Sequence, residues 1–470
     1  MILRLRPGLV ISKSARLLGL FSALLTLSFS SARAASVLDI GTNYRMRAIS
    51  FDKVTFGADG DQNYSYFSER AQAHIGGRFS PNLEFMTQFQ ALGISGSSSS
   101  TISNPTLNPG GGRYPSTGFS PFVQNAYLKA KQLYDWPIDL TIGRQPITLG
   151  DGFILSDDDL GFTGLRMQSR LPVADLRADT FWMRTGSTLQ GSNNSDIYGL
   201  ELTKPLRNIR YQLAIVNERD STGQNNYIRP SENPANLTKY PVGTDFTASN
   251  ITRTFYDARV ESRLSEGGFL KGEFALQTGH VDRSSATLGA VDLGGYAFLV
   301  SGGLFTRFSK YGPIEIHGSF GIASGDSGGG KDNSFQPTYG HKYDGLERSG
   351  FGEFYGATLY DALPSSGNAR GLPPGFSGMR VIGAGVTTHP TALLSIGIDY
   401  FVFTAQESPS AEFPVGSSDD SLGTELDIGV GFAYTSYLSF RGSFALFSPG
   451  KAYEHTDNAR RIAIEAVGHF

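Results

Sequence analysis

The chain has 470 residues, no cysteine, and 40 basic against 43 acidic residues. Without cysteine, an exported chain must hold itself together by hydrogen bonding and burial rather than by disulfides, and without a basic excess we expect no nucleic-acid partner. Its 58 glycines, 33 phenylalanines and 21 tyrosines indicate β-sheet with tight turns and aromatic belts rather than a soluble α/β enzyme.

Residues 1–34 have the three parts of a secretory signal. A basic start precedes an apolar run of about 13 residues at 17–29, and an A-x-A-like cleavage site follows at 32–34. The run is shorter than the roughly 20 residues of a spanning helix, and no later stretch reaches that length. We therefore expect cleavage near Ala34, which leaves 35 basic and 43 acidic residues in a mature domain at 35–470.

Eighteen segments of this mature domain alternate between apolar and polar side chains, as strands with two different faces do. The predicted strands are 37–50, 63–79, 82–93, 119–130, 137–145, 162–170, 174–186, 195–204, 208–219, 250–264, 269–281, 293–308, 313–323, 378–388, 391–405, 422–434, 437–448 and 460–470.

The connections between these strands are alternately short and long. Every second one is a short turn, and most of the others are long and polar, notably 94–118, 220–249, 324–377 and 406–421. Short turns at one rim and long loops at the other are typical of outer-membrane barrels. The sequence therefore predicts an all-β fold, an 18-stranded antiparallel transmembrane β-barrel with long extracellular loops and short periplasmic turns, in the bacterial outer membrane.

The last strand, 461–470, is apolar on one face, charged on the other, and ends in Phe470. It resembles the C-terminal strand by which outer-membrane barrels are recognised for insertion. The alternative is an ordinary sandwich strand that ends in Phe470 by chance. From the first interpretation we expect three partners: outer-membrane lipid, lipopolysaccharide and the barrel-insertion machinery.

The polar faces of the strands predict a charged lumen. In 252–264, for example, the even positions suit lipid and the odd positions are mostly charged. The same parity selects the candidate pore-lining residues, which are Arg45, Arg47, Arg70, Arg78, Arg166, Arg170, Arg177, Asp179, Arg253, Asp257, Arg259, Glu261, Arg263, Glu425, Asp427 and Arg441. A lipid-facing Arg or Lys at the midplane costs about 2–4 kcal/mol, so this sorting favours a water-filled interior. Whether the arginines pair with inward acids or contact solute stays open, as do the orientations of Arg144, Arg307 and Arg380.

Sequence patterns for metal binding and catalysis are weak. Asp157, Asp158 and Asp159 could gather calcium through carboxylate oxygens, although a solvated acidic loop is the simpler interpretation. We expect no other cofactor. A hydrolase built on the barrel would need serine, histidine and a carboxylate near one rim, and the spacing shows no such set, so we expect no enzymatic activity.

Several segments resemble the alginate-export family of outer-membrane barrels. They are 143–151 (GRQPITLGD), 162–166 (FTGLR), 325–340 with its FQP triplet, 422–427 (LGTELD) and 447–450 (FSPG). This resemblance implies an eighteen-stranded channel with an arginine-rich lumen, and some family members pass acidic polysaccharide.

These patterns together predict a porin-like channel for small or oligomeric solutes, with acidic saccharides as one candidate class. Because inward acids offset the inward arginines, we expect only a weak preference for anions. A loop as long as 324–377 could fold inward and narrow the pore. The alternatives are a barrel-borne hydrolase and a barrel that serves as a scaffold for its surface loops.

Overall fold

The computed structural model describes residues 38–53, 63–95, 118–157, 161–171, 175–187, 193–222, 248–264, 267–283, 289–308, 312–326, 328–337, 351–355, 378–406, 419–453 and 456–470. The signal predicted at 1–34 lies outside these residues.

The described part of the chain is almost entirely β-strand. The strands are β1 (Leu38–Asp52), β2 (Tyr64–Ser80), β3 (Leu83–Ser95), β4 (Gly118–Ala130), β5 (Ile138–Gln145), β6 (Phe162–Leu171), β7 (Leu176–Ser187), β8 (Asn194–Leu206), β9 (Ile209–Asp220), β10 (Ala248–Arg263), β11 (Gly268–Arg283), β12 (Val291–Phe308), β13 (Gly312–Ala323), β14 (Lys331–Asp332), β15 (Met379–Thr388), β16 (Leu394–Ala405), β17 (Ser421–Ala433), β18 (Leu438–Pro449) and β19 (Ala459–His469). A short 3-10 turn, η2 (Leu133–Asp135), lies between β4 and β5. Within the described residues, no helix has the length and apolar character needed to cross a membrane.

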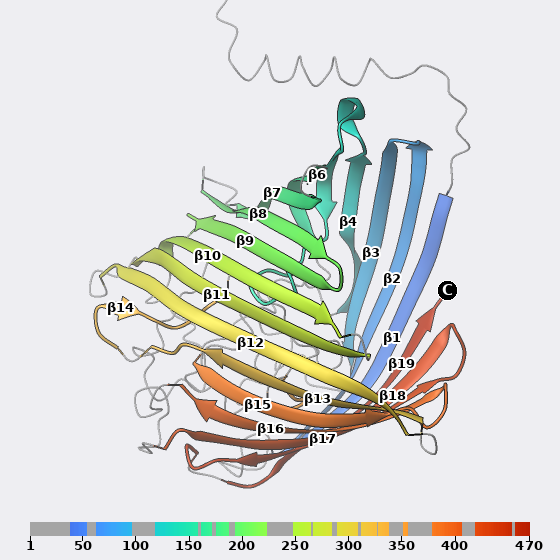
Figure 1. Cartoon of the computed structure of the whole chain (residues 1–470), viewed down its shortest axis with the longest axis vertical. Coiled ribbons are helices and arrows are strands. Elements are labelled where there is room, and N and C mark those ends of the chain that lie inside the picture. The colour runs from blue at the N-terminus through green and yellow to red at the C-terminus, as the bar shows by residue number, and fades with distance from the viewer. Residues whose placement is uncertain are drawn as a thin grey trace, which may run out of the picture.

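The sheet closes on itself because its first and last strands pair. β1 runs antiparallel to β19 from Asn43 opposite His469 to Asp52 opposite Arg460 (Figure 1). Each other long strand pairs with its neighbours in the chain, and β13 pairs directly with β15. The two-residue strand β14 belongs to the intervening loop and lies parallel to β12. The eighteen long strands therefore form a closed antiparallel barrel, which confirms the predicted fold class.

All eighteen predicted strands are present, and their ends agree with the prediction to within three residues. Short connections, such as residues 207–208 and 434–437, gather at one rim, which we call the turn rim. The opposite rim, the loop rim, carries the long connections, including the one between β13 and β15.

The wall has an apolar outward face and a charged inward face. In β10, the outward side chains of Tyr256 and Val260 are 48% and 43% exposed, whereas inward Phe255 and Arg259 are 0% and 5% exposed. Exposed large apolar side chains recur on the outward face of nearly every strand. This alternation is the pattern of a barrel whose outer surface contacts lipid.

The buried apolar core lies inside the barrel, towards the loop rim. It combines inward wall residues such as Phe255 and Phe447 with loop residues such as Leu155, Phe335 and Phe354. Because loop residues fill this part of the interior, the lumen is constricted there.

Candidate functional site

A glycine near the end of β5 precedes the first loop that enters the lumen. Gly143 has φ +124°, and a Cβ at this position would lie 2.4 Å from the Ala126 carbonyl oxygen. Such a conformation favours glycine. The Arg144 side chain, whose orientation the sequence left open, donates through Nε to the Gln124 carbonyl at 3.1 Å. Its Cγ lies near Gly161, at the end of the loop.

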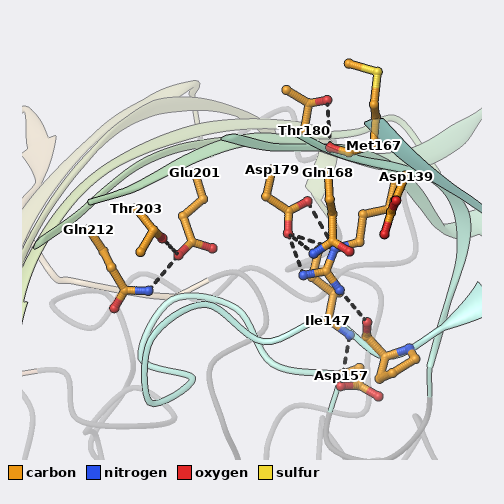
Figure 2. Close-up of polar contacts among 12 residues, drawn as sticks. Asp139, Ile147, Asp157, Met167, Gln168, Asp179, Thr180, Glu201, Thr203 and Gln212 are labelled. Atoms are coloured by element: carbon orange, nitrogen blue, oxygen red, sulfur yellow. Dashed lines mark hydrogen bonds and ion pairs between the residues drawn. The ribbon is translucent and has the colours of Figure 1, made fainter. Parts of the chain in front are cut away.

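The first lumen loop, residues 146–157, is a hairpin. Leu149 donates its backbone N–H to Leu155 at 2.9 Å, and Asp157 donates to Ile147 at 3.0 Å. The side chains of Ile147, Leu149, Ile154 and Leu155 are buried. Figure 2 shows Ile147 and Asp157 of this loop on the same side of the wall as Asp179 and Glu201, while Met167 projects from the opposite side.

Charged contacts hold this loop against two parts of the wall. Near its base, Arg166 donates through Nη1 to the Pro146 carbonyl at 3.2 Å and pairs with Asp179 through Nε at 2.9 Å (Figure 2). At its tip, Asp151 accepts a hydrogen bond from Nη2 of Arg259 at 2.8 Å. The loop therefore crosses the interior from β5 and β6 to β10.

The second lumen loop connects β13 to β15 and contacts the first one. Phe335 stacks on Phe153 with ring centroids 5.1 Å apart. The Gln336 backbone N–H donates to Oε1 of Gln277 at 2.7 Å, and its carbonyl accepts from Nη1 of Arg253 at 3.1 Å. This part of the loop therefore lies against β10 and β11.

A later segment of the same loop, residues 351–355, binds a different part of the wall through its backbone. Its three successive N–H groups at Glu353, Phe354 and Tyr355 donate to the Glu425 carboxylate at 2.6, 2.6 and 2.7 Å. Glu353 N–H also lies 2.9 Å from Oδ2 of Asp427. Charge-assisted bonds of this kind are among the stronger hydrogen bonds in proteins, so this segment is anchored to β17.

The Glu353 side chain continues the anchor onto the last two strands. Its Oε1 accepts from Nη2 of Arg441 at 2.9 Å, and its Oε2 accepts from Nη1 of Arg461 at 2.6 Å. The segment 351–355 thus bridges β17, β18 and β19.

Aromatic packing buries the same segment. Tyr355 stacks on Phe447 and packs against Phe403, with centroid distances of 4.6 and 4.8 Å, and Phe354 stacks on Phe447 at 5.7 Å. The Tyr355 hydroxyl hydrogen-bonds with that of Tyr453 at 2.8 Å. Burial raises the pKa of Tyr355 well above its ordinary value, and the neighbouring Tyr453 raises that pKa further.

Most of the predicted charged residues take part in ion pairs. These join Arg45 to Glu465, Arg78 to Glu84, Arg166 to Asp179, Arg170 to Asp175, Arg253 to Glu218, Arg259 to Asp151, Glu261 to Arg210, and Arg441 to Glu353. Glu425 and Asp427 bind loop backbone. Pairing therefore accounts for much of the charge on the inward face.

The remaining candidates fall into two groups. Arg47 and Asp257 are buried on the inward face, and Arg70 lies opposite Arg45 in the sheet. Arg177 and Arg263 are exposed near the turn rim, and neither has an ion pair within the described residues. That these residues line a conducting path stays a prediction.

The loop carboxylates that bind the inward arginines were not identified from the sequence; they are Asp151 on Arg259 and Glu353 on Arg441 and Arg461. Asp151 and Glu353 lie outside any strand, so strand parity does not select them. Only one feature of the sequence pointed to Asp151: it is the last residue of the 143–151 segment that resembles the alginate-export family.

The sequence also left the orientations of Arg307 and Arg380 undecided, and the structure describes only one of these side chains. Arg380 is exposed and shares the outward face of β15 with Ile382, which is 53% exposed. The Arg307 side chain lies outside the described residues.

The predicted calcium ligands are only partly described. Asp157 accepts hydrogen bonds from the backbone N–H groups of Ile147 and Gly161 at 3.3 and 3.0 Å, which holds the loop base together. Asp158 and Asp159 lie outside the described residues. In the described ranges, no three histidine or carboxylate side chains converge as metal ligands would.

Solved structures with the same fold include two proteins from Pseudomonas aeruginosa. OccK9 (OpdG) is 14% identical, with a TM-score of 0.53, and the match covers 92% of this chain and 98% of that one. OccK8 (OprE) is 12% identical, with a TM-score of 0.51 and the same coverage. At these identities the likeness shows a shared outer-membrane barrel fold. No curated protein matches the chain.

A family comparison extends over nearly the whole barrel. The model described as Alginate export matches residues 36–465, from before β1 to within β19. This range contains both lumen loops and the charged wall that anchors them. The chain, a closed outer-membrane β-barrel, therefore belongs to the alginate export family.

Proposed function

We propose that this protein is a passive outer-membrane channel for small or oligomeric solutes, including acidic saccharides, which pass through its charged and constricted lumen. The observation that carries the proposal is the anchoring of two loops inside the barrel, by Asp151 on Arg259 at 2.8 Å and by Glu353 on Arg461 at 2.6 Å. Loops held inside a barrel narrow a path through it. A scaffold for surface loops would need no such anchors.

The charge distribution favours a weak preference for anions. Many inward arginines are neutralised by a partner, as Arg166 is by Asp179 and Arg253 by Glu218. Arg177 and Arg263 have no ion pair within the described part of the wall and are exposed near the turn rim. Their unbalanced charge supports entry of acidic or neutral solutes. The family name agrees with an acidic saccharide as one such solute.

Reconstitution in a planar bilayer tests the proposal. We expect discrete conductance steps and, in a salt gradient, a reversal potential of weak anion preference. Arg177→Ala combined with Arg263→Ala should move that potential towards cations. Lys204→Ala removes a base from the outward face of β8 and should leave the potential unchanged. A silent bilayer or clear cation selectivity in the parent would count against the proposal.

A further inference from the structure

The outward face of β7, β8 and β9 changes character towards the loop rim. Leu200, Leu213 and Ile215 are exposed in its apolar zone. One step nearer the loop rim, Trp182 and Tyr198 lie opposite each other on neighbouring strands. Aromatic side chains of this kind mark the membrane interface. The next residues towards the rim therefore lie at headgroup level.

Three charged residues occupy that next level in one row across the strands. Asp196 lies opposite Arg184 on one side and opposite Arg219 on the other. All three have the same parity as the exposed apolar residues, so they lie on the outer surface. An arginine facing lipid is costly at the midplane but is tolerated near the interface, which is where these two stand.

The contacts within the row orient one arginine and leave an excess of positive charge. Arg184 donates to both carboxylate oxygens of Asp196, through Nε at 2.9 Å and Nη2 at 3.2 Å. Trp182 donates its indole N–H to the same carboxylate at 3.2 Å, and the Arg184 guanidinium lies 5.5 Å from the Trp182 ring centre. The Arg184 side chain nevertheless remains 41% exposed, and Arg219 is exposed beside it. Two guanidinium groups thus stand beside one carboxylate, and within the described residues only that of Arg184 is hydrogen-bonded to it.

We propose that Arg184 and Arg219 bind the phosphate of an outer-leaflet glycolipid, with Trp182 and Tyr198 packing below it at the interface. Arginine is suited to this role because its planar fork binds phosphate through two parallel hydrogen bonds. The row faces the membrane, so the ligand is a membrane lipid rather than a solute of the lumen. Arg380, another outward arginine, likewise lies at the loop-rim end of its strand.

Lipid titration of the purified full chain in detergent micelles tests this site. The probes are bisphosphorylated lipid A, the same lipid after enzymatic removal of both phosphates, and inorganic phosphate. The parent should bind the phosphorylated lipid about tenfold or more tightly than the dephosphorylated one, as expected for losing charge-assisted contacts. Arg184→Gln with Arg219→Gln should abolish that preference. Lys204→Gln, which changes a base on the same outward face near the turn rim, should retain it.

Equal affinity of the parent for the two lipids would overturn the proposal, and so would an unchanged preference in the double variant. Competition by inorganic phosphate at the affinity of the lipid would show a free-anion site instead. Heat-modifiable electrophoretic mobility establishes that each variant is folded. If the double variant does not fold, Arg219→Gln alone serves, since within the described residues this side chain forms no hydrogen bond that the change would break. Because the row lies outside the lumen, the outcome is independent of conductance.

Discussion

Arg461 in the closing strand holds the carboxylate of Glu353, which lies 108 residues earlier in the chain, at 2.6 Å. The two side chains are only 2% and 9% exposed, so the pair is shielded from water. Removing one member of a buried ion pair leaves the other charge without compensation, which costs about 3–5 kcal/mol. This contact is therefore one of the anchors that hold the segment 351–355 inside the lumen.

Glu353→Gln should release that segment from the wall. The change removes the charge that Arg441 and Arg461 share while keeping the size of the side chain, so we expect docking to weaken by about 3–5 kcal/mol. Single-channel recording should show a larger conductance, and limited proteolysis should cleave the loop. Asp175→Asn disrupts an exposed pair with Arg170 and should change neither result. Identical conductance and cleavage for Glu353→Gln and the parent would contradict this role.

Gly352→Ala should release the same segment by a steric route. Gly352 has φ +92°, and a Cβ there would lie 2.5 Å from Oε1 of Glu425. The conformation alone costs a non-glycine residue about 1–2 kcal/mol, and the clash adds to that cost. Gly429→Ala on β17 is the matched control, because a Cβ there meets nothing within 4 Å. A Gly352→Ala channel that behaves like the Gly429→Ala channel would refute the observed backbone geometry.

Docking of Tyr355 should depend on pH in the alkaline range. Burial raises the pKa of Tyr355 in the docked state, so its stabilising contribution is complete below the ordinary tyrosine pKa of about 10 and is lost as pH rises above it. Protease sensitivity of the loop should therefore increase above about pH 10. Tyr355→Phe should reduce this dependence, whereas Tyr134→Phe, at an exposed position in the turn rim, should not. Equal alkaline sensitivity in both variants would assign the effect to other groups.

Asp151→Asn should increase the preference for anions. Asp151 neutralises Arg259 at 2.8 Å and lies 3.6 Å from Lys271, so its loss adds one net positive charge to the constriction. Charges are screened within about 8 Å at physiological salt, so the shift in reversal potential should grow as ionic strength falls. Asp282→Asn removes an acid from the outward face of β11 and should have no effect. A reversal potential unchanged from that of the parent would place Asp151 away from the ion path and contradict this prediction.

The sequence predicted the wall well because the wall obeys a local rule. In β10 the side chains of Tyr256 and Val260 point outward and those of Asp257 and Arg259 inward, as period-two alternation requires. That rule needs only neighbouring residues. It also located all eighteen strands, since each short turn interrupts the alternation at a predictable place.

The interior could not be predicted in the same way. Asp151 contacts Arg259, and Glu353 contacts Arg461, each across 108 residues. No periodicity links a loop carboxylate to an arginine so distant in the chain. Arg144 shows a second limit, because the glycine conformation at Gly143 and the register shift between β3 and β4 are local irregularities that strand parity does not anticipate.

The pairing of β1 with β19 has a consequence for biogenesis. Asn43 lies opposite His469, so the contact that closes the ring joins the first and the last strand of the barrel, more than 400 residues apart in the chain. Such a large sequence separation makes closure slow relative to hairpin formation between neighbours. Until β19 pairs with it, β1 must present an unpaired edge, and such an edge is a template for aggregation. Each newly made molecule therefore needs protection of that first edge for the whole time that its remaining strands are being exported and ordered.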